Sequence, residues 1–173
     1  MAIERSVFLE VLKDSYGAYY NLAENVQTEL PLVFRADYRA RDERYWLTKS
    51  VQIWANEKNE YAYVFSAPAF TPETVARCID YAWEDTLPRV KPHKEHQCTN
   101  AKVIFVADSL DRAAVKAVQG DNRSKSYKFG LHGYSNLLAA AVDLNEQKTY
   151  TNKAGYELAA YFKKLFAARD ERA

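Results

Sequence analysis

The sequence predicts an α/β fold in which helices cover both faces of one mixed sheet. Segments with apolar residues at helical spacing occur along the chain together with segments in which apolar and polar residues alternate. The continuous apolar run from Val103 to Ala107 is typical of a central strand that is covered on both faces. The expected order is α-β-β-β-α-β-α-β-β-α, an antiparallel meander that a parallel crossover extends.

Residues 3–26 predict a long amphipathic first helix, because apolar side chains recur on one stripe and the charged side chains fall off it. Gly17 weakens the middle of this helix by about 1 kcal/mol relative to Ala, so we expect tertiary packing to hold that turn. The stripe consists of Ile3, Val7, Val11, Leu12, Ser15, Tyr19, Leu22 and Val26.

Three strands are predicted next, at 32–41, 45–55 and 61–66, because apolar and polar residues alternate through the first two and apolar residues dominate the third. The segments between them, at 42–43 and 56–59, are typical of turns. Such short connections cannot cross over a sheet, so the three strands are expected to pair as an antiparallel meander.

A second helix begins at Thr71, which is a favoured N-cap, and Pro72 and Glu73 follow in the first turn. Pro88 ends this helix, and residues 88–100 are expected to form an irregular polar loop before the central strand. The third strand, this helix and the central strand then form a right-handed parallel crossover.

The remaining elements are expected, in order, as a helix at 110–118, strands at 126–132 and 137–144, and a helix at 153–168. Ser109 and Asn152 are the expected N-caps, and Gly120 ends the shorter helix. The sequence contains no internal repeat or linker, so residues 1–173 are interpreted as a single domain.

The chain is rich in tyrosine, with 13 Tyr in an aromatic fraction of 14%. A tyrosine ring fills a core, but its hydroxyl needs a partner or water, so tyrosine is enriched at interfaces and pockets. The leading hypothesis is therefore a non-enzymatic domain that binds a ligand or a protein, or regulates one, and that forms a homo-oligomer, plausibly a homodimer.

The two cysteines and the lack of a secretory signal pattern predict a cytoplasmic protein with free thiols. The longest apolar run, Leu137 to Val142, is far shorter than the ~20 residues that a membrane helix needs, so no membrane partner is expected. Net charge is +1, which predicts no strong overall field, although residues 88–128 carry nine Lys or Arg against four acidic residues.

The predicted opening order, α-β-β-β-α-β, resembles the core order of the PD-(D/E)xK nuclease-like architecture. The resemblance implies an enzyme, or a degenerate enzyme, that acts on nucleic acid or a phosphorylated ligand. That family needs an Asp near the second strand and Glu-x-Lys on the third to hold Mg²⁺ and activate water. The predicted third strand and the residue before it, which together start Glu60-Tyr61-Ala62, contain no Lys.

Asp143, Glu146 and Lys148 have the composition of a metal-dependent nuclease site, but residues 145–148 are interpreted as an exposed turn. Asp108 and Asp111 follow the central strand, where α/β sheets bind ligands. They are interpreted as ligands for a cation or a substrate hydroxyl, or simply as part of the helix cap, which is the favoured alternative.

His132 lies in a glycine-flanked bend near Ser135 and is a candidate catalytic base. No nucleophile elbow accompanies it, so a hydrogen-bonded structural histidine is the favoured alternative. The candidate zinc ligands are Cys78, His93, His96 and Cys98. Their spacing matches no familiar zinc site, so a polar loop with a small buried thiol is preferred and no cofactor is expected.

Five cations are candidate ligand-binding residues, namely Arg35, Arg39, Lys49, Arg89 and Lys91. With neighbouring Trp side chains, those near the first two predicted strands could pair and stack with nucleic acid. The preferred alternative is an edge strand whose charges discourage aggregation, so nucleic acid is the less favoured partner. Gly-rich phosphate loops are absent from the sequence, which excludes the commonest nucleotide-binding designs.

Overall fold

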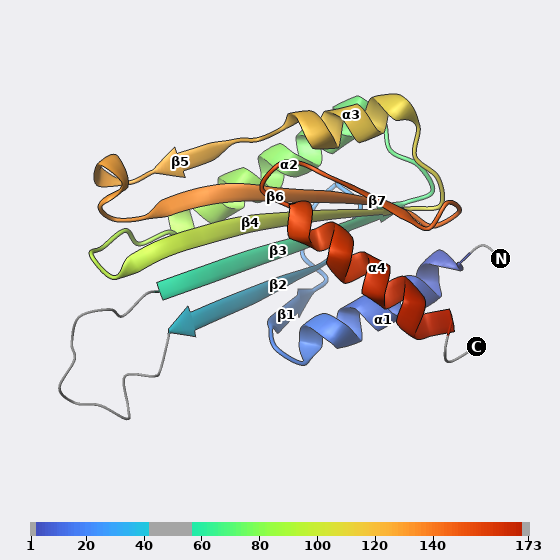
Figure 1. The fold of residues 1–173 in the computed structure, drawn as a ribbon, viewed down its shortest axis with the longest axis horizontal. Helices are drawn as coiled ribbons and strands as arrows, with labels where there is room; N and C mark the ends of the chain where they lie inside the picture. The colour runs from blue at the N-terminus through green and yellow to red at the C-terminus, as the bar shows by residue number, and fades with distance from the viewer. Residues whose placement is uncertain (1–2, 42–56, 171–173) are drawn as a thin grey trace.

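The computed structural model describes residues 3–41 and 57–170, which form a seven-stranded mixed sheet with α-helices on both faces (Figure 1). The predicted mixed α/β class and element order are confirmed. The helices are α1 (Arg5–Gly17), α2 (Pro72–Thr86), α3 (Arg112–Gly120) and α4 (Tyr156–Asp170), with 3₁₀ turns at Leu87–Arg89 and Lys128–Gly130. The strands are β1 (Asn21–Glu24), β2 (Leu32–Arg41), β3 (Glu57–Ala67), β4 (His96–Ala107), β5 (Ser124–Ser126), β6 (Tyr134–Asp143) and β7 (Lys148–Thr151).

The strands lie in the order β1-β2-β3-β4-β6-β5, and β7 pairs with β6 farther along the same edge as β5. β1, β2 and β3 pair antiparallel, whereas β3, β4 and β6 pair parallel. Each parallel link needs a crossover, which α2 supplies between β3 and β4 and α3 supplies between β4 and β6. An antiparallel meander with a parallel extension is therefore observed, and its three antiparallel strands are β1, β2 and β3.

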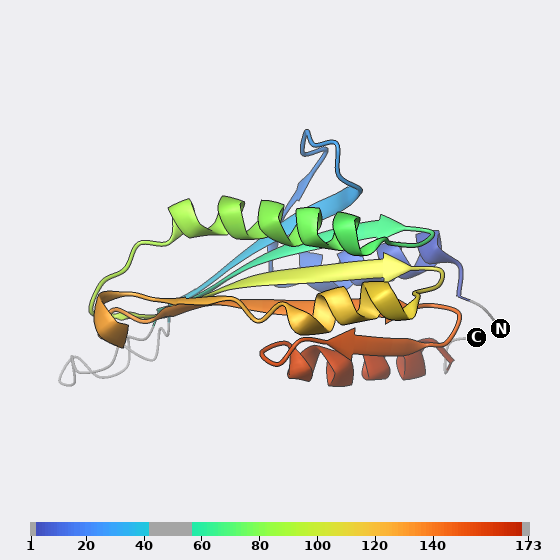
Figure 2. The same cartoon turned by 90° about the horizontal axis from the view of Figure 1, so that it is seen from above.

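β4 is the central strand, and residues 103–107 are completely buried, as the apolar run predicts. Val103 and Phe105 face a core beneath α2 and α3, in which Phe105 stacks on Phe65 with ring centroids 5.8 Å apart. Ile104 and Val106 face a second core beneath α1 and α4. Figure 2 shows α2 and α4 on opposite sides of the sheet.

The first helix ends at Gly17, not at 26, because residues 21–24 leave the helical path and pair with β2 as β1. Asn25 then takes a left-handed conformation with φ 58°, which turns the chain away from β1. Leu22 still packs against the core beneath α1 and α4. The rest of the predicted stripe is largely wrong, because Val7, Val11 and Tyr19 are exposed and α1 buries Phe8, Leu12 and Tyr16. The predicted strand at 45–55 lies outside the described residues.

Other boundaries also differ from the expectation. β3 begins at Glu57, inside the predicted turn at 56–59, and so contains Lys58. α4 begins at Tyr156, so Asn152 is not its N-cap. The predicted loop ends earlier, because β4 begins at His96. The predicted strand at 126–132 is wrong: β5 ends at Ser126, and the left-handed residues Lys128 and Phe129 then form a bend. Asp111, rather than Ser109, caps α3 by accepting a hydrogen bond from the Ala114 amide at 2.8 Å. β7, at Lys148–Thr151, lies in a segment for which no strand was predicted.

Asn152 joins β5 and β7 into a continuous edge along β6. β5 covers residues 134–136 of β6 and β7 covers 140–143, so a gap separates them. The Asn152 side chain fills that gap, accepting from Ala139 N at 3.0 Å and donating to the Leu137 carbonyl at 2.8 Å. It also donates to the Asp121 carbonyl and accepts from Gly155 N, so one buried amide satisfies four backbone groups.

None of the helices within 3–41 and 57–170 combines the length and the apolar character that crossing a bilayer requires.

Asn152→Ala is expected to lower the free energy of unfolding by at least about 3 kcal/mol, because it leaves several buried backbone groups without partners. Urea denaturation followed by circular dichroism measures this loss. Asn122→Ala is the matched control, since the exposed Asn122 accepts one hydrogen bond, from Lys153 N, and its loss should cost less than about 1 kcal/mol. Equal losses in the two variants would contradict the bridging role.

Candidate functional site

The face of the sheet beneath α1 and α4 is only half covered by the described helices. In Figure 1, α1 and α4 lie toward the end of the sheet where β3 and β4 end, and the N-terminal parts of these strands extend beyond both helices. On this face, the apolar pattern of Val64, Ile104 and Val106 gives way to polar side chains toward the open end. Two rows of aligned residues cross β3, β4 and β6 there: Glu60, Asn100 and Asn136, then Lys58, Cys98 and Tyr134.

Glu60 and Lys102 form an ion pair at the boundary between the covered and open parts of this face. Lys102 Nζ lies 2.8 Å from Glu60 Oε2, and the Tyr20 hydroxyl donates to the same carboxylate oxygen. Lys102 is only 8% exposed, and its Nζ also lies 5.7 Å from the Tyr16 ring centroid. A partly buried ion pair of this kind is far less screened by salt than a surface pair.

Burial and charge act in opposite directions on the Glu60 carboxyl. Burial raises its pKa, but the Lys102 charge and hydrogen bonds from Lys102, Tyr20 and Asn100 outweigh burial and leave the pKa below its ordinary value. The Tyr20 pKa is raised, first by burial and then by the hydrogen bond to Glu60. At neutral pH, Glu60 is therefore a carboxylate and Tyr20 a protonated phenol.

Two hollows meet at this ion pair. A pocket of about 350 Å³ lies between α1, α4 and β4, and its walls include Tyr16, Tyr19, Tyr20, Tyr161 and Lys102. A more open groove of about 580 Å³ runs over the uncovered strands, and its walls include Glu60, Lys58, Asn100, Cys98 and Tyr134. We call them the tyrosine pocket and the sheet groove.

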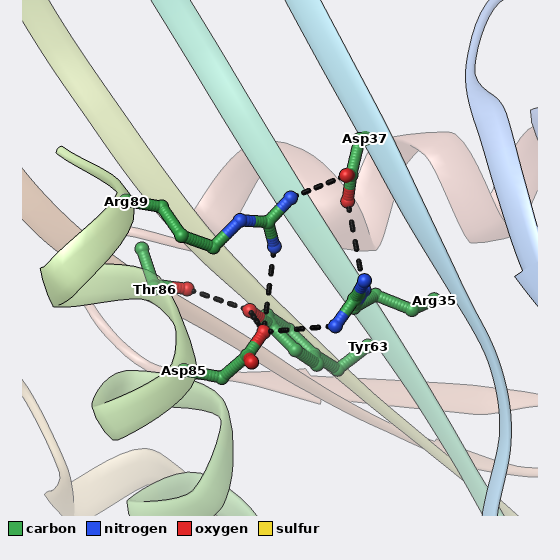
Figure 3. Close-up of polar contacts among 6 residues, drawn as sticks. All are labelled: Arg35, Asp37, Tyr63, Asp85, Thr86 and Arg89. Atoms are coloured by element: carbon green, nitrogen blue, oxygen red, sulfur yellow. Dashed lines mark hydrogen bonds and ion pairs between the residues drawn. The ribbon is translucent and has the colours of Figure 1, made fainter. Parts of the chain in front are cut away.

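A second polar cluster lies on the opposite face of the sheet, beneath α2 (Figure 3). Arg35 and Arg89 each place a guanidinium nitrogen 3.3 Å from Asp85 Oδ2, and Arg89 also pairs with Asp37. The Tyr63 hydroxyl donates to Asp85 at 2.6 Å and contacts the Thr86 hydroxyl at 2.9 Å. Two cations and two anions balance, so the cluster ties β2 and β3 to the end of α2.

In this cluster, two of the predicted ligand-binding cations are already paired with carboxylates of the chain. Arg35 and Arg89 face carboxylates, and the Arg89 guanidinium also lies 3.6 Å from the Tyr61 ring centroid. Lys91 is exposed in the connection that precedes β4. Lys49 and the side chain of Arg39 lie outside what the structure describes, so the five cations are not brought together among the described residues.

The predicted catalytic carboxylates have separate partners. Asp143 is 3% exposed and accepts hydrogen bonds from Leu110 N and Glu146 N, each at 2.8 Å. Asp111 caps α3, and Asp108 pairs with Arg5 at 3.4 Å. The predicted turn at 145–148 is largely confirmed: residues 144–147 form it, and Lys148 begins β7.

The histidines and cysteines are also separated. Cys78 lies in the core beneath α2, where burial raises its thiol pKa to about 12, whereas Cys98 lines the sheet groove on the other face. His96 Nδ1 donates to the His132 carbonyl at 2.6 Å, and its Nε2 lies 2.8 Å from the Thr99 hydroxyl. Within the described ranges, no three His, Cys, Asp or Glu residues lie where they could share a metal ion.

The sequence did not single out Tyr20, Glu60 and Lys102 as a site. The sequence signal that could have found part of this site is a polar residue next to an apolar run. Lys102 directly precedes the buried run at 103–107. Pairing Glu60 with Lys102 requires the parallel β3–β4 register, which places Glu60 opposite Asn100 and Ala62 opposite Lys102. The register between two strands cannot be inferred from the composition of the chain or from the spacing of its residues.

The fold and the site define an α/β domain with a half-open mixed sheet, a tyrosine pocket and a buried ion pair. The chain belongs to the family described as Domain of unknown function (DUF8052), whose pattern matches residues 4–164. Comparison with curated proteins and with solved structures gave no match.

Glu60→Gln is expected to make the free energy of unfolding less dependent on pH at acidic pH. A lowered folded pKa stabilises the fold above the ordinary glutamate pKa of 4.5, and this contribution is lost as pH falls through the lower folded value. Below pH 4.5 the variant should therefore lose less stability per pH unit than the wild type. Urea titrations across that range measure the difference. Glu10→Gln, at an exposed site on α1, should parallel the wild type, and a parallel Glu60→Gln profile would contradict the ion pair's role.

Proposed function

We propose that this chain is a non-enzymatic binding domain whose tyrosine pocket holds a small, flat, uncharged molecule. The observation that supports the proposal most directly is the lining of the pocket. Four tyrosines form its walls, and the charge of Lys102, which also lines it, is balanced by Glu60. Its volume of about 350 Å³ falls at the lower end of the range typical of ligand sites.

The tyrosine walls support one another and offer flat surfaces. The Tyr16 ring lies 4.8 Å from Tyr20 and 6.5 Å from Tyr161, measured between centroids. Tyr19 is 79% exposed and stands at the mouth of the pocket. Aromatic walls favour a planar ligand, because stacked and edge-on ring pairs add stabilisation beyond the area that they bury.

The charges around the pocket favour an uncharged ligand with hydrogen-bonding groups. A ligand carboxylate would have to compete with Glu60 for Lys102 in a partly buried position, where breaking an ion pair is costly. The hydroxyls of Ser15 and Tyr161 lie 2.8 Å apart, and either one can donate to the other. This pair can therefore adapt to a ligand acceptor or a ligand donor.

The enzymatic alternative receives no comparable support from the geometry. A nuclease-like site needs its carboxylates and a lysine on one face of the sheet. Asp37 is aligned with Tyr61, on the α2 face, whereas Glu60 and Lys102 lie on the other face. Asp108 and Asp143, at the C-terminal ends of β4 and β6, have the separate partners described above.

The proposed location is the cytoplasm. Cys78 and Cys98 are both free thiols, and they lie on opposite faces of the sheet. Unpaired cysteines fit a reducing compartment, where thiols stay reduced.

A screen of uncharged heteroaromatic fragments tests the proposed pocket. Fragments that raise the melting temperature should bind Tyr19→Ala about fivefold to tenfold more weakly, because the variant removes one wall. Tyr156→Ala is the matched control, since Tyr156 is 67% exposed on α4 and does not line the pocket. The proposal fails if no fragment binds the wild type, or if Tyr19→Ala binds the fragments as tightly as the control does.

We also propose that the domain forms a homodimer in which α1 of one copy contacts α1 of the other. Val7 and Val11 lie one turn apart on α1 and are 42% and 39% exposed. Sedimentation velocity should show a dimer at high protein concentration, and Val11→Glu should shift it to monomer because it places a charge in the apolar contact. Lys163→Glu, an exposed charge change on α4, should leave the dimer intact. A strictly monomeric wild type would contradict this part.

A further inference from the structure

The bend between β5 and β6, residues 127–133, has an unusual backbone. Lys128, Phe129 and Gly130 are consecutive left-handed residues, with φ values of 48°, 55° and 87°. This conformation is costly for residues other than glycine, so it persists only where the surrounding structure enforces it. Strained residues of this kind are concentrated at functional sites.

The bend is held firmly at its base. The amides of Gly130 and His132 both donate to the Tyr127 carbonyl, and Tyr127 N donates to the Gly133 carbonyl at 3.0 Å. His96 Nδ1 donates to the His132 carbonyl, which fixes the bend to β4. A Cβ on Gly133 would collide with the backbone of His96 and Gln97, so only glycine allows this close contact.

This rigid base presents apolar side chains to solvent. Phe129 is 100% exposed, Leu131 is 73% exposed and Tyr134 is 49% exposed. An isolated exposed apolar residue needs no explanation, but here a strained backbone aims an entire aromatic ring into water. Packing within the described chain gives no reason for this arrangement, which points to a contact with another molecule.

The surroundings of the bend are basic. Desolvation and then the neighbouring Lys128, His93, Lys94 and His96 lower the pKa of His132, so these groups lie close to it, and the two lysines are cations. Lys125 Nζ lies 5.5 Å from the Tyr127 ring centroid, which adds a further cation. Glu95 is the acidic residue in the adjoining connection. The field around Phe129 therefore favours an anionic partner.

A sheet edge adjoins the bend. β5 is the last strand of the described sheet on this side, and Ser124, Lys125 and Ser126 are all exposed. An exposed edge can pair with an extended segment of another chain, whose backbone then continues the sheet. β5 leads directly into the bend, so a segment paired with it would also reach Phe129.

We propose that β5 and the bend at 127–133 form a docking surface for an extended, acidic protein segment that carries an apolar side chain. The segment pairs with the β5 edge, its carboxylates face Lys125 and Lys128, and its apolar side chain covers Phe129 and Leu131. A protein segment fits better than nucleic acid, because Leu131 offers no stacking face and the adjoining sheet groove contains Glu60. This surface is independent of the tyrosine pocket.

Selection from a random dodecapeptide display library against the full chain tests the proposal. Enriched peptides should be acidic and contain an aromatic or aliphatic residue. A synthetic copy of the strongest one, measured by fluorescence polarisation, should bind Phe129→Ser about tenfold more weakly, the loss typical of a central interface anchor. Lys125→Glu should also weaken binding, and added salt should weaken wild-type binding.

Tyr156→Ser is the matched control, because it removes an exposed aromatic ring from α4 and should leave peptide binding unchanged. Phe129 is fully exposed, so Phe129→Ser should keep the wild-type melting temperature; if it does not, Leu131→Ser replaces it in the same measurement. The proposal is overturned by a lack of enrichment, by basic consensus peptides, by equal binding to Phe129→Ser, or by tighter binding of single-stranded oligothymidylate than of any enriched peptide.

Discussion

The fold depends on the burial of β4 on both of its faces. Val103 and Phe105 pack beneath α2 and α3 while Ile104 and Val106 pack beneath α1 and α4, so a single strand belongs to both cores. Because β4 lies between β3 and β6 with its hydrogen bonds satisfied on both edges, it also sets the parallel register of its neighbours. The alignment of Glu60, Lys102 and the polar rows of the sheet groove follows from that register.

The site exists because the strands are longer than the helices that cover them. The 12 residues of β4 span about 40 Å, whereas the 13 residues of α1 span about 20 Å. Helices of that length cannot cover a whole strand, and the part of β4 beyond them carries Asn100 and Cys98 instead of apolar residues. Lys102 lies at the transition, where its stem contacts rings and its charge meets Glu60.

Local patterns predicted most of the fold, and tertiary geometry accounts for what they missed. The run at 103–107 and the Thr71 cap were recognised because burial and capping act on neighbouring residues. β1 was misassigned because Leu22 fits both a helical stripe and a short strand, and only its pairing with Ala36 decides between them. The bend at Lys128 was missed because left-handed lysine and phenylalanine have no sequence signature. The candidate site needed the β3–β4 register, so its three central residues were not found, whereas Arg35 and Arg89 were noticed for charges that their carboxylate neighbours neutralise.

Asn152 shows how a side chain can act as a peptide unit. Its amide oxygen accepts and its NH₂ group donates, as a peptide unit does, so β6 meets a continuous row of partners although two separate strands lie beside it. The interruption in that row is thereby closed to a strand from a neighbouring molecule. The Asn152 side chain, with the Arg123 carbonyl and the Asn152 amide N–H, thus protects the middle of β6 against edge-to-edge pairing with another sheet.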